Sequence, residues 1–209
     1  MAIVTVPSAR HESKSRLLDA SLHVIRARGY AAATVDDICD YAGLTKGSFF
    51  HHFEGKEALA LEAAAHFSSL AKSVFAAAPY RTLSDPLERL LGYVDFRKAI
   101  LRGELPDYTC LFGTMVQEIY ETHPAIRSAC EKGISEHAAS LEADIAEAMR
   151  KYKVGTEWTA KSLALHTQAV IQGAFILAKT KNGPAVAGEC LDHLRRYVGM
   201  LFNQAQAEE

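Results

Sequence analysis

Side chains that bind phosphates and base edges crowd into one short segment of the chain. The segment reads Thr45-Lys46-Gly47-Ser48-Phe49-Phe50-His51-His52-Phe53. Lys46 supplies a positive charge, and Gly47 allows a close backbone approach because it has no side chain. Ser48 and His51 carry groups that hydrogen-bond to base edges or to phosphate oxygens. The residue types therefore indicate contact with a nucleic acid.

The two adjacent histidines also raise the possibility of a metal site. Neighbouring residues on a helix point about 100° apart, and neither His51 nor His52 has a Cys or His four residues further on. A zinc site needs several such ligands on one side. We therefore expect neither a metal nor a cofactor here.

The binding segment must be positioned by the helices around it. Thr34 is expected to cap a short helix over Val35–Tyr41, and Thr45 to cap the next helix, which ends near Gly55. Between them, Ala42-Gly43-Leu44 provides a glycine for a tight reversal. Phe49 and Phe53, four residues apart, would face the core.

A longer helix is expected before these two, with Ser13 as its cap and Gly29 at its end. Its apolar stripe follows a helical period and consists of Leu17, Leu18, Ser21, Val24 and Ile25. Three helices of which the last two are short and joined at a glycine form a helix-turn-helix, whose final helix enters the major groove of DNA.

The overall charge of −2 does not exclude DNA binding, because the charges are unevenly spread. Residues 1–34 contain five basic and two acidic residues, which gives a local net charge of +3. Among the basic residues, Arg10, Lys14 and Arg16 form either a solvated face or a set of phosphate contacts.

The rest of the chain continues as helices, so we expect an all-α protein of nine helices in two domains. The domains would be residues 1–55, which bind DNA, and residues 56–209, which bind a ligand and dimerise. The six further helices are expected at residues 56–77, 84–102, 107–122, 124–153, 157–181 and 185–204.

Localisation is expected to be cytoplasmic, without contact to a membrane. No apolar run approaches the roughly 20 residues of a membrane span, and Met1–Pro7 lacks the basic and apolar regions of a signal peptide. The four cysteines show no C-x-x-C pair.

Several segments together resemble the DNA-binding signature of TetR/AcrR-type regulators. They are Thr34-Val35-Asp36-Asp37-Ile38, the run from Ala42 to Phe53, and Lys56-Glu57-Ala58-Leu59. The resemblance covers about residues 15–61. It implies a homodimeric one-component transcription factor that binds double-stranded operator DNA, usually a repressor released by a small molecule.

By position, the resemblance carries DNA contacts over to a defined set of residues: Thr34, Thr45, Lys46, Gly47, Ser48, His51, His52 and, at the start of the fourth helix, Lys56. One position departs from the family pattern. Phe50 stands where tyrosine is most common, so a hydroxyl contact to phosphate is lost, at a cost of about 1 kcal/mol.

The C-terminal part carries no nucleotide-binding, P-loop, nucleophile-elbow or zinc-protease motif, so we expect no enzyme. Helical bundles hold small apolar ligands between their helices. Candidate ligand-binding residues, each also compatible with ordinary core packing, are Phe67, Phe96, Cys110, Phe112, Met115, Trp158 and His166.

Cys110 opens an alternative trigger, since a thiol at the start of a helix could react with an electrophile or an oxidant. A buried, unreactive cysteine is the other interpretation. Two rival functions remain: a small-molecule or thiol-redox sensor with weak or lost DNA recognition, and an enzyme that uses Cys110 or His166.

The last two helices are expected to form the homodimer interface. One carries Leu163, Val170, Ala174 and Leu177 on a face, and the other carries Leu191, Leu194, Val198, Leu201 and Phe202. Two such stripes can pack against a symmetry mate as four helices. The long helix over 56–77 would then transmit ligand binding to the DNA-binding head.

Overall fold

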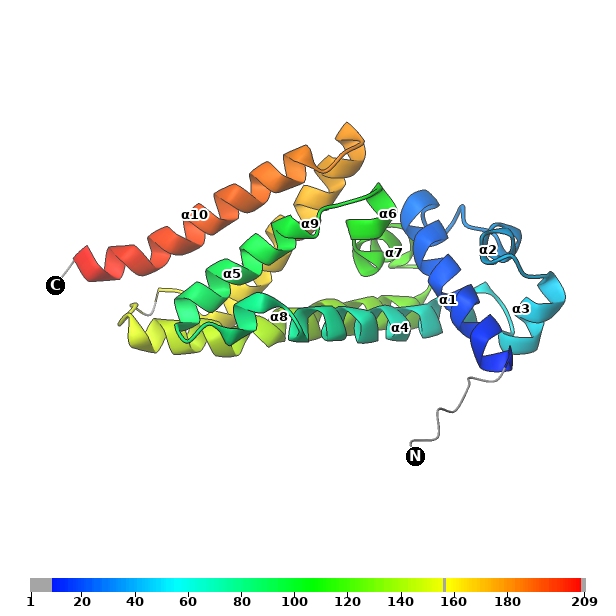
Figure 1. The fold of residues 1–209 in the computed structure, drawn as a ribbon, viewed down its shortest axis with the longest axis horizontal. Coiled ribbons are helices and arrows are strands. Elements are labelled where there is room, and N and C mark those ends of the chain that lie inside the picture. Colours follow the sequence, from blue (N-terminus) through cyan, green and yellow to red (C-terminus); the bar gives the residue numbers. More distant parts are fainter. Residues whose placement is uncertain (1–8, 156, 208–209) are drawn as a thin grey trace, which may run out of the picture. The chain divides into compact units, whose positions relative to one another are not determined.

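The computed structural model describes residues 9–155 and 157–207, with side chains for 12–155 and 157–202, and this part of the chain contains helices and no strand (Figure 1). The all-α prediction is confirmed. The elements are α1 (Ala9–Arg28), α2 (Val35–Ala42), α3 (Lys46–His52), α4 (Lys56–Ala76), η1 (Pro79–Thr82), α5 (Pro86–Ala99), α6 (Leu105–Tyr108), α7 (Leu111–Ile119), α8 (Pro124–Lys151), α9 (Ala160–Lys181) and α10 (Ala185–Ala207).

The expected count of nine helices is wrong for the described residues, which form ten α-helices and one 3₁₀ turn. The helix expected over 107–122 is two helices, α6 and α7, because the chain leaves helical geometry at Thr109 (φ −79°, ψ 161°). The Thr109 hydroxyl donates to the carbonyl of Leu105 at 2.7 Å, which closes the short α6 in place of a further turn.

Two helix starts also differ from expectation. α1 begins at Ala9, ahead of the expected cap Ser13. The cap of α5 is Asp85, whose carboxylate accepts from the backbone N–H groups of Leu87 and Glu88 at 2.9 and 3.0 Å. The range 84–102 expected from the sequence begins one residue before this cap, at Ser84. A carboxylate next to the N1 proline satisfies these N–H groups better than the Ser84 hydroxyl would, because the helix dipole favours a negative charge there.

The chain forms two compact units, and each unit is built from two separate stretches of the sequence. Unit 1 runs to Leu70 and includes Leu111–Cys130, whereas unit 2 comprises Ala71–Cys110 and the chain from Glu131 onward. The helices α4 and α8 therefore contribute residues to both units. The functional boundary between residues 55 and 56 stays a prediction.

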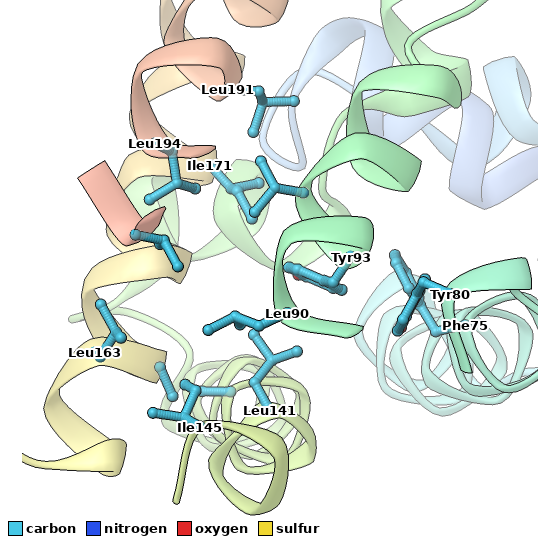
Figure 2. Packing of buried hydrophobic residues seen from close by; sticks show 14 of the residues in the cluster. Phe75, Tyr80, Leu90, Tyr93, Leu141, Ile145, Leu163, Ile171, Leu191 and Leu194 are labelled. Carbon is cyan, nitrogen blue, oxygen red and sulfur yellow. The ribbon is translucent and has the colours of Figure 1, made fainter. Parts of the chain in front are cut away.

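The core of unit 2 consists of side chains from α5, α8, α9 and α10 together with Phe75, Ala78, Tyr80 and Tyr108. Figure 2 shows Leu90 and Tyr93 of α5 between the α8 residues Leu141 and Ile145 and the side chains of the last two helices. The chain reverses at Asn182, which has left-handed geometry (φ 49°), so that α10 packs against α9 and α5. The break between the helices expected at 157–181 and 185–204 is confirmed.

Most residues of the predicted apolar stripes of the last two helices serve this core, so the buried members of these stripes cannot form a dimer interface. The side chains of Leu163 and Ala174 in α9 are buried within the unit, as are four residues of α10: Leu191, Leu194, Val198 and Phe202. Val170 and Leu201 pack at its margin. Leu177 alone among the stripe residues is 43% exposed. One helical face cannot both fill a subunit core and cover a partner.

None of the described helices is long and apolar enough to cross a lipid bilayer.

A row of hydrogen bonds runs through the unit 2 core. The amide Nε2 of Gln168 donates to Tyr93 Oη at 3.2 Å, and Tyr93 Oη lies 2.9 Å from His137 Nε2. Burial, together with the charges of Arg97 and Arg81, lowers the pKa of His137 to about 3. The ring is therefore neutral at pH 7, and Nε2 accepts the proton of the Tyr93 hydroxyl.

This histidine makes the stability of the protein depend on pH. Unfolding returns the pKa of His137 from about 3 to its usual value near 6.5, so the unfolded state binds an extra proton below pH 6.5 and stability falls as the pH falls. We expect the free energy of unfolding of wild type to drop by up to about 1.4 kcal/mol per pH unit more than that of His137→Gln between pH 6 and 4.5. Urea titrations at each pH measure this difference, and parallel slopes for the two proteins would contradict it.

Candidate nucleic-acid interface

The start of α2 is held by a capping box around Thr34. The Thr34 hydroxyl accepts from the backbone N–H of Asp37 at 3.1 Å, and the Asp37 carboxylate accepts from the backbone N–H of Thr34 at 3.0 Å. The Thr34 hydroxyl also donates to the Asp37 carboxylate at 2.7 Å. This bond lowers the pKa of Asp37, as do the bond from the Thr34 N–H and the ion pair to Arg28. The expected cap is confirmed, and it leaves Thr34 exposed at the end of α2.

The turn between α2 and α3 depends on Gly43, which adopts left-handed geometry (φ 61°). Its N–H bonds to the carbonyl of Asp40 at 3.1 Å and ends the helix. From α1, the guanidinium of Arg16 donates to the carbonyl of Ala42 at 2.5 Å. Arg16 therefore closes the C-terminal end of α2, a structural contact that differs from the phosphate contact considered from the sequence.

The helix α3 has one buried side and one exposed side. Phe49 and Phe53 are buried, as expected from their spacing, and their ring centres lie 5.5 Å apart. On the outer side, Phe50 is 59% exposed. The other exposed residues of the segment are Thr45, Lys46, Gly47 and His51, and Ser48 is half-buried. The exposed ring of Phe50 can contact a thymine methyl group, although it cannot donate a hydrogen bond.

The charge on α3 has a partner within the protein. The Lys46 ammonium lies 2.8 Å from a carboxylate oxygen of Asp36 in α2, and both side chains are exposed. Hydrogen bonding to Asp36 raises the pKa of Lys46, which therefore remains charged at neutral pH. An exposed ion pair of this kind contributes little stability, so Lys46 can exchange Asp36 for a phosphate oxygen at low cost.

The two histidines of α3 lie in different environments. His51 is exposed, whereas His52 is half-buried and its Nε2 lies 2.7 Å from the hydroxyl oxygen of Ser13 in α1. The predicted DNA contact of His52 stays a prediction. No group of three potential metal ligands occurs among the described residues.

Lys56 anchors the loop between α1 and α2. Its ammonium donates to the carbonyl oxygens of Tyr30 and Ala33 at 2.9 and 3.0 Å, and lies 4.5 Å from the centre of the Tyr30 ring. Ala31 O is a third acceptor at 3.3 Å. The phosphate contact expected for Lys56 stays a prediction, and its visible role is to order this loop.

A second residue, Glu118 of α7, holds the same loop and was not found from the sequence. Its carboxylate accepts from the backbone N–H of Ala31 at 2.8 Å. Gly29 has left-handed geometry (φ 87°), and a Cβ atom at this position would lie 2.0 Å from Glu118 Oε1. No local pattern signals such a contact, because the two segments are 87 residues apart.

The remaining basic residues of α1 differ in their surroundings. The Lys14 ammonium pairs with Glu62 of α4 at 2.6 Å, so this partly exposed ion pair bridges two helices of unit 1. The side chain of Arg10 lies outside the described part of the chain. Phosphate contacts by either residue stay predictions.

The seven candidate ligand-binding residues are divided between the two units. Phe67 and Phe112 meet edge to face in unit 1 at 5.2 Å, where Met115 is fully buried. In unit 2, Phe96 packs against Phe75 and Tyr80, whereas Trp158 packs against Phe202.

The two reactive candidates, Cys110 and His166, also lie in unit 2. Cys110 is half-buried against the unit 2 core, directly before α7. His166 is exposed and lies 5.2 Å from the ring of Tyr197. The reactive-thiol trigger at Cys110 stays a prediction.

Both the N-terminal and the C-terminal part of the chain match models of the same protein family. Residues 17–63 match the family model of bacterial regulatory proteins of the tetR family. Residues 86–194, more than half of the 209, match the model of the tetracyclin repressor-like C-terminal domain.

Individual relatives match over different lengths. The HTH-type transcriptional repressor DhaR of Mycobacterium sp. (strain GP1) is 25% identical over 171 residues, which cover 82% of this chain and 84% of that protein. The uncharacterised HTH-type transcriptional regulator YerO of Bacillus subtilis (strain 168) is 37% identical over 57 residues, 27% of this chain and 20% of YerO. A TetR-family regulator from Agrobacterium tumefaciens has the same fold, with a TM-score of 0.80 at 19% identity, over 90% of this chain and 98% of that one.

The contact between Gly29 and Glu118 can be tested by a double-mutant cycle. We expect Gly29→Ala to destabilise wild type by about 1–2 kcal/mol from left-handed geometry alone, plus the cost of displacing Glu118. In the Glu118→Ala background only the first cost remains, so the two substitutions should be coupled by about 1 kcal/mol or more. Urea denaturation of the four proteins measures the coupling, and additive effects would show that the carboxylate does not constrain this loop.

Proposed function

The chain belongs to the TetR family of bacterial transcriptional regulators, and we propose that it binds a pseudo-palindromic operator as a homodimer and leaves it when unit 2 binds a small molecule. The observation that carries the proposal is the exposed polar side of α3. The helix α3 follows α2 after a glycine turn, and each of the two helices begins at a capping threonine. This is the local geometry of a helix-turn-helix.

In this proposal, α3 of each subunit enters one of two successive major grooves, with half-site centres roughly 34–36 Å apart. Lys46 and Thr34 bind phosphates, which position the protein. Ser48, Phe50 and His51 meet base edges, which supply specificity. Operator sequence follows from these three side chains and their exposed neighbours.

A second copy of the chain would cover the outer side of α9 and α10. Large apolar side chains remain exposed there after the core is filled, which is costly on a surface that stays in water. They are Leu165, Ile176 and Leu177 on α9, and Tyr197 and Met200 on α10. Leu177 was already part of the expected interface, and the other four residues replace the buried members of the stripes as the proposed dimer interface.

Release from DNA requires an effector that binds one conformation better than the other. By linkage, it weakens operator binding only by that difference in affinity. The helix α4 is a covalent route for this coupling, because it begins at Lys56, which anchors the α1–α2 loop, and ends in unit 2.

The cytoplasm is the proposed location of the protein, because a transcriptional regulator must reach DNA. The expectation drawn from Met1–Pro7 concerns residues outside the described part of the chain.

DNA binding can be tested by fluorescence anisotropy on the upstream intergenic DNA and on a scrambled duplex at rising salt. We expect tight, sequence-selective binding with a steep salt dependence. Lys46→Met should weaken binding to both duplexes and reduce the slope of log K against log salt by about 0.9 per subunit.

The matched control is Lys72→Met, since Lys72 is an exposed lysine of unit 2 that pairs with Glu136 at 2.8 Å. It should leave both affinity and slope unchanged. Weak binding that is equal on the two duplexes would favour the alternative of a sensor with lost DNA recognition.

The dimer interface can be tested by placing charge on it. Leu177→Glu combined with Met200→Glu should weaken dimerisation more than tenfold, because two carboxylates would be buried without partners. Sedimentation velocity at micromolar concentration measures the effect. Leu83→Glu, a comparably exposed leucine outside these helices, is the control, and a wild-type monomer would refute the interface.

A further inference from the structure

An arginine stands on the buried side of α5. Leu90, Tyr93 and Val94 are buried, and Arg97 follows them at the next position of the same helical face. Of the three basic residues in α5, Arg89 pairs with Asp144 and Lys98 with Asp192. Arg97 has no carboxylate within ion-pair distance among the residues that the structure describes. A basic residue in an apolar stripe is the sequence signal that was missed.

Aromatic rings surround the Arg97 guanidinium in place of an anion. Its central carbon lies 4.8 Å from the ring centre of Phe75, 5.8 Å from that of Tyr93 and 5.9 Å from that of Phe175. The Nε atom is buried and has no hydrogen-bond acceptor in the described chain. Planar guanidinium groups stack on such rings while their N–H donors stay available in the plane.

Two tyrosine hydroxyls in the same region also lack partners. The side chains of Tyr80 and Tyr108 are only 4% and 8% exposed, and neither Oη atom has a hydrogen-bond partner among the described residues. The Tyr80 ring lies 5.9 Å from that of Tyr93, and the Tyr108 ring 6.4 Å from that of Phe175. Figure 2 shows Tyr80 and Phe75 beside Tyr93. Both tyrosines thus flank rings that Arg97 contacts.

All three unpartnered groups carry a hydrogen-bond donor, and the charges of Arg81 and Arg97 act on Tyr80, as does the carboxylate of Asp144. Burial raises the pKa of Tyr80 to about 12 and also raises the pKa of Tyr108, so both phenols remain protonated. Arg81, also close by, shares Asp144 with Arg89. Buried donors without acceptors are rare in native proteins and call for an explanation.

We propose that Arg97, Tyr80 and Tyr108 bind the carboxylate of an organic acid whose apolar body packs among Phe75, Tyr93, Phe96 and Phe175. The inference rests on the proposed function in one respect, that unit 2 binds the effector. One unpaired guanidinium matches one negative charge, and its planar fork matches a carboxylate with two parallel hydrogen bonds. Phe96 and Arg97 are partly exposed, so this end of the proposed site reaches the surface of the unit.

The probes for the test are two acids and their neutral amides: benzoate with benzamide, and octanoate with octanamide. Thermal denaturation and titration calorimetry of the full-length protein report binding without DNA. We expect at least one acid to bind and to raise the Tm, and its amide to have no effect. Absence of binding by both acids, or equal binding of an acid and its amide, would overturn the proposal.

Variants assign the binding to the named groups. Arg97→Gln should weaken acid binding at least tenfold, and Arg97→Lys should restore only part of it because an ammonium lacks the planar fork. Tyr80→Phe and Tyr108→Phe should each weaken binding about threefold to tenfold. Both substitutions retain the aromatic ring and its packing, so they test the site even if Arg97→Gln does not fold. Arg102→Gln removes an exposed arginine of the following loop and should change nothing.

Anisotropy with operator DNA separates this proposal from the proposed function. Acid binding that depends on Arg97 in a protein that never binds DNA would support the site and refute the regulator. DNA binding that neither acid affects, with wild-type acid affinity in Arg97→Gln, would refute the site and leave the regulator intact.

Discussion

The order of the DNA-binding head depends on how one loop satisfies its backbone carbonyls. The chain leaves α1 at Gly29 and enters α2 at Thr34, and the carbonyls between them cannot bond within either helix. The Lys56 ammonium binds them from α4, and Glu118 binds the N–H of Ala31 from α7. A lysine serves three acceptors at once because its three N–H donors rotate freely about one stem. The Lys56 ammonium and the Glu118 carboxylate therefore fix the loop that leads into α2, and the turn at Gly43 then positions α3 relative to α2.

Features formed by residues close together in the sequence, such as helix caps and turns, could be predicted from the sequence alone. Thr34, Thr45 and Gly43 act within a few residues of their own position, and the sequence shows both the cap and the groups that it serves. The exposed side of α3 followed from the spacing of Phe49 and Phe53 for the same reason. The boundary between α6 and α7 was missed because Thr109 reads as an ordinary helical residue until its hydroxyl replaces the next backbone bond.

Contacts between distant segments could not be predicted in the same way. The last two helices show apolar residues on more than one side, and periodicity alone does not say which side meets the subunit's own core. The buried side was therefore mistaken for the partner surface. The same limit applies to Tyr93, His137 and Gln168, which come from three helices and meet only in the folded unit. Their hydrogen bonds follow from packing, which pattern reading does not supply.

The ion pair between Asp36 and Lys46 gives the head an internal competitor for DNA. When Lys46 reaches a phosphate, it exchanges one anion for another, so its contribution to affinity is the difference between two ion pairs. Asp36 also stays close by, at 2.8 Å in the unbound protein. When the protein dissociates from the duplex, the Asp36 carboxylate can re-form its ion pair with Lys46 before the ammonium is fully hydrated. Such a head gives up some binding strength and gains faster exchange between sites.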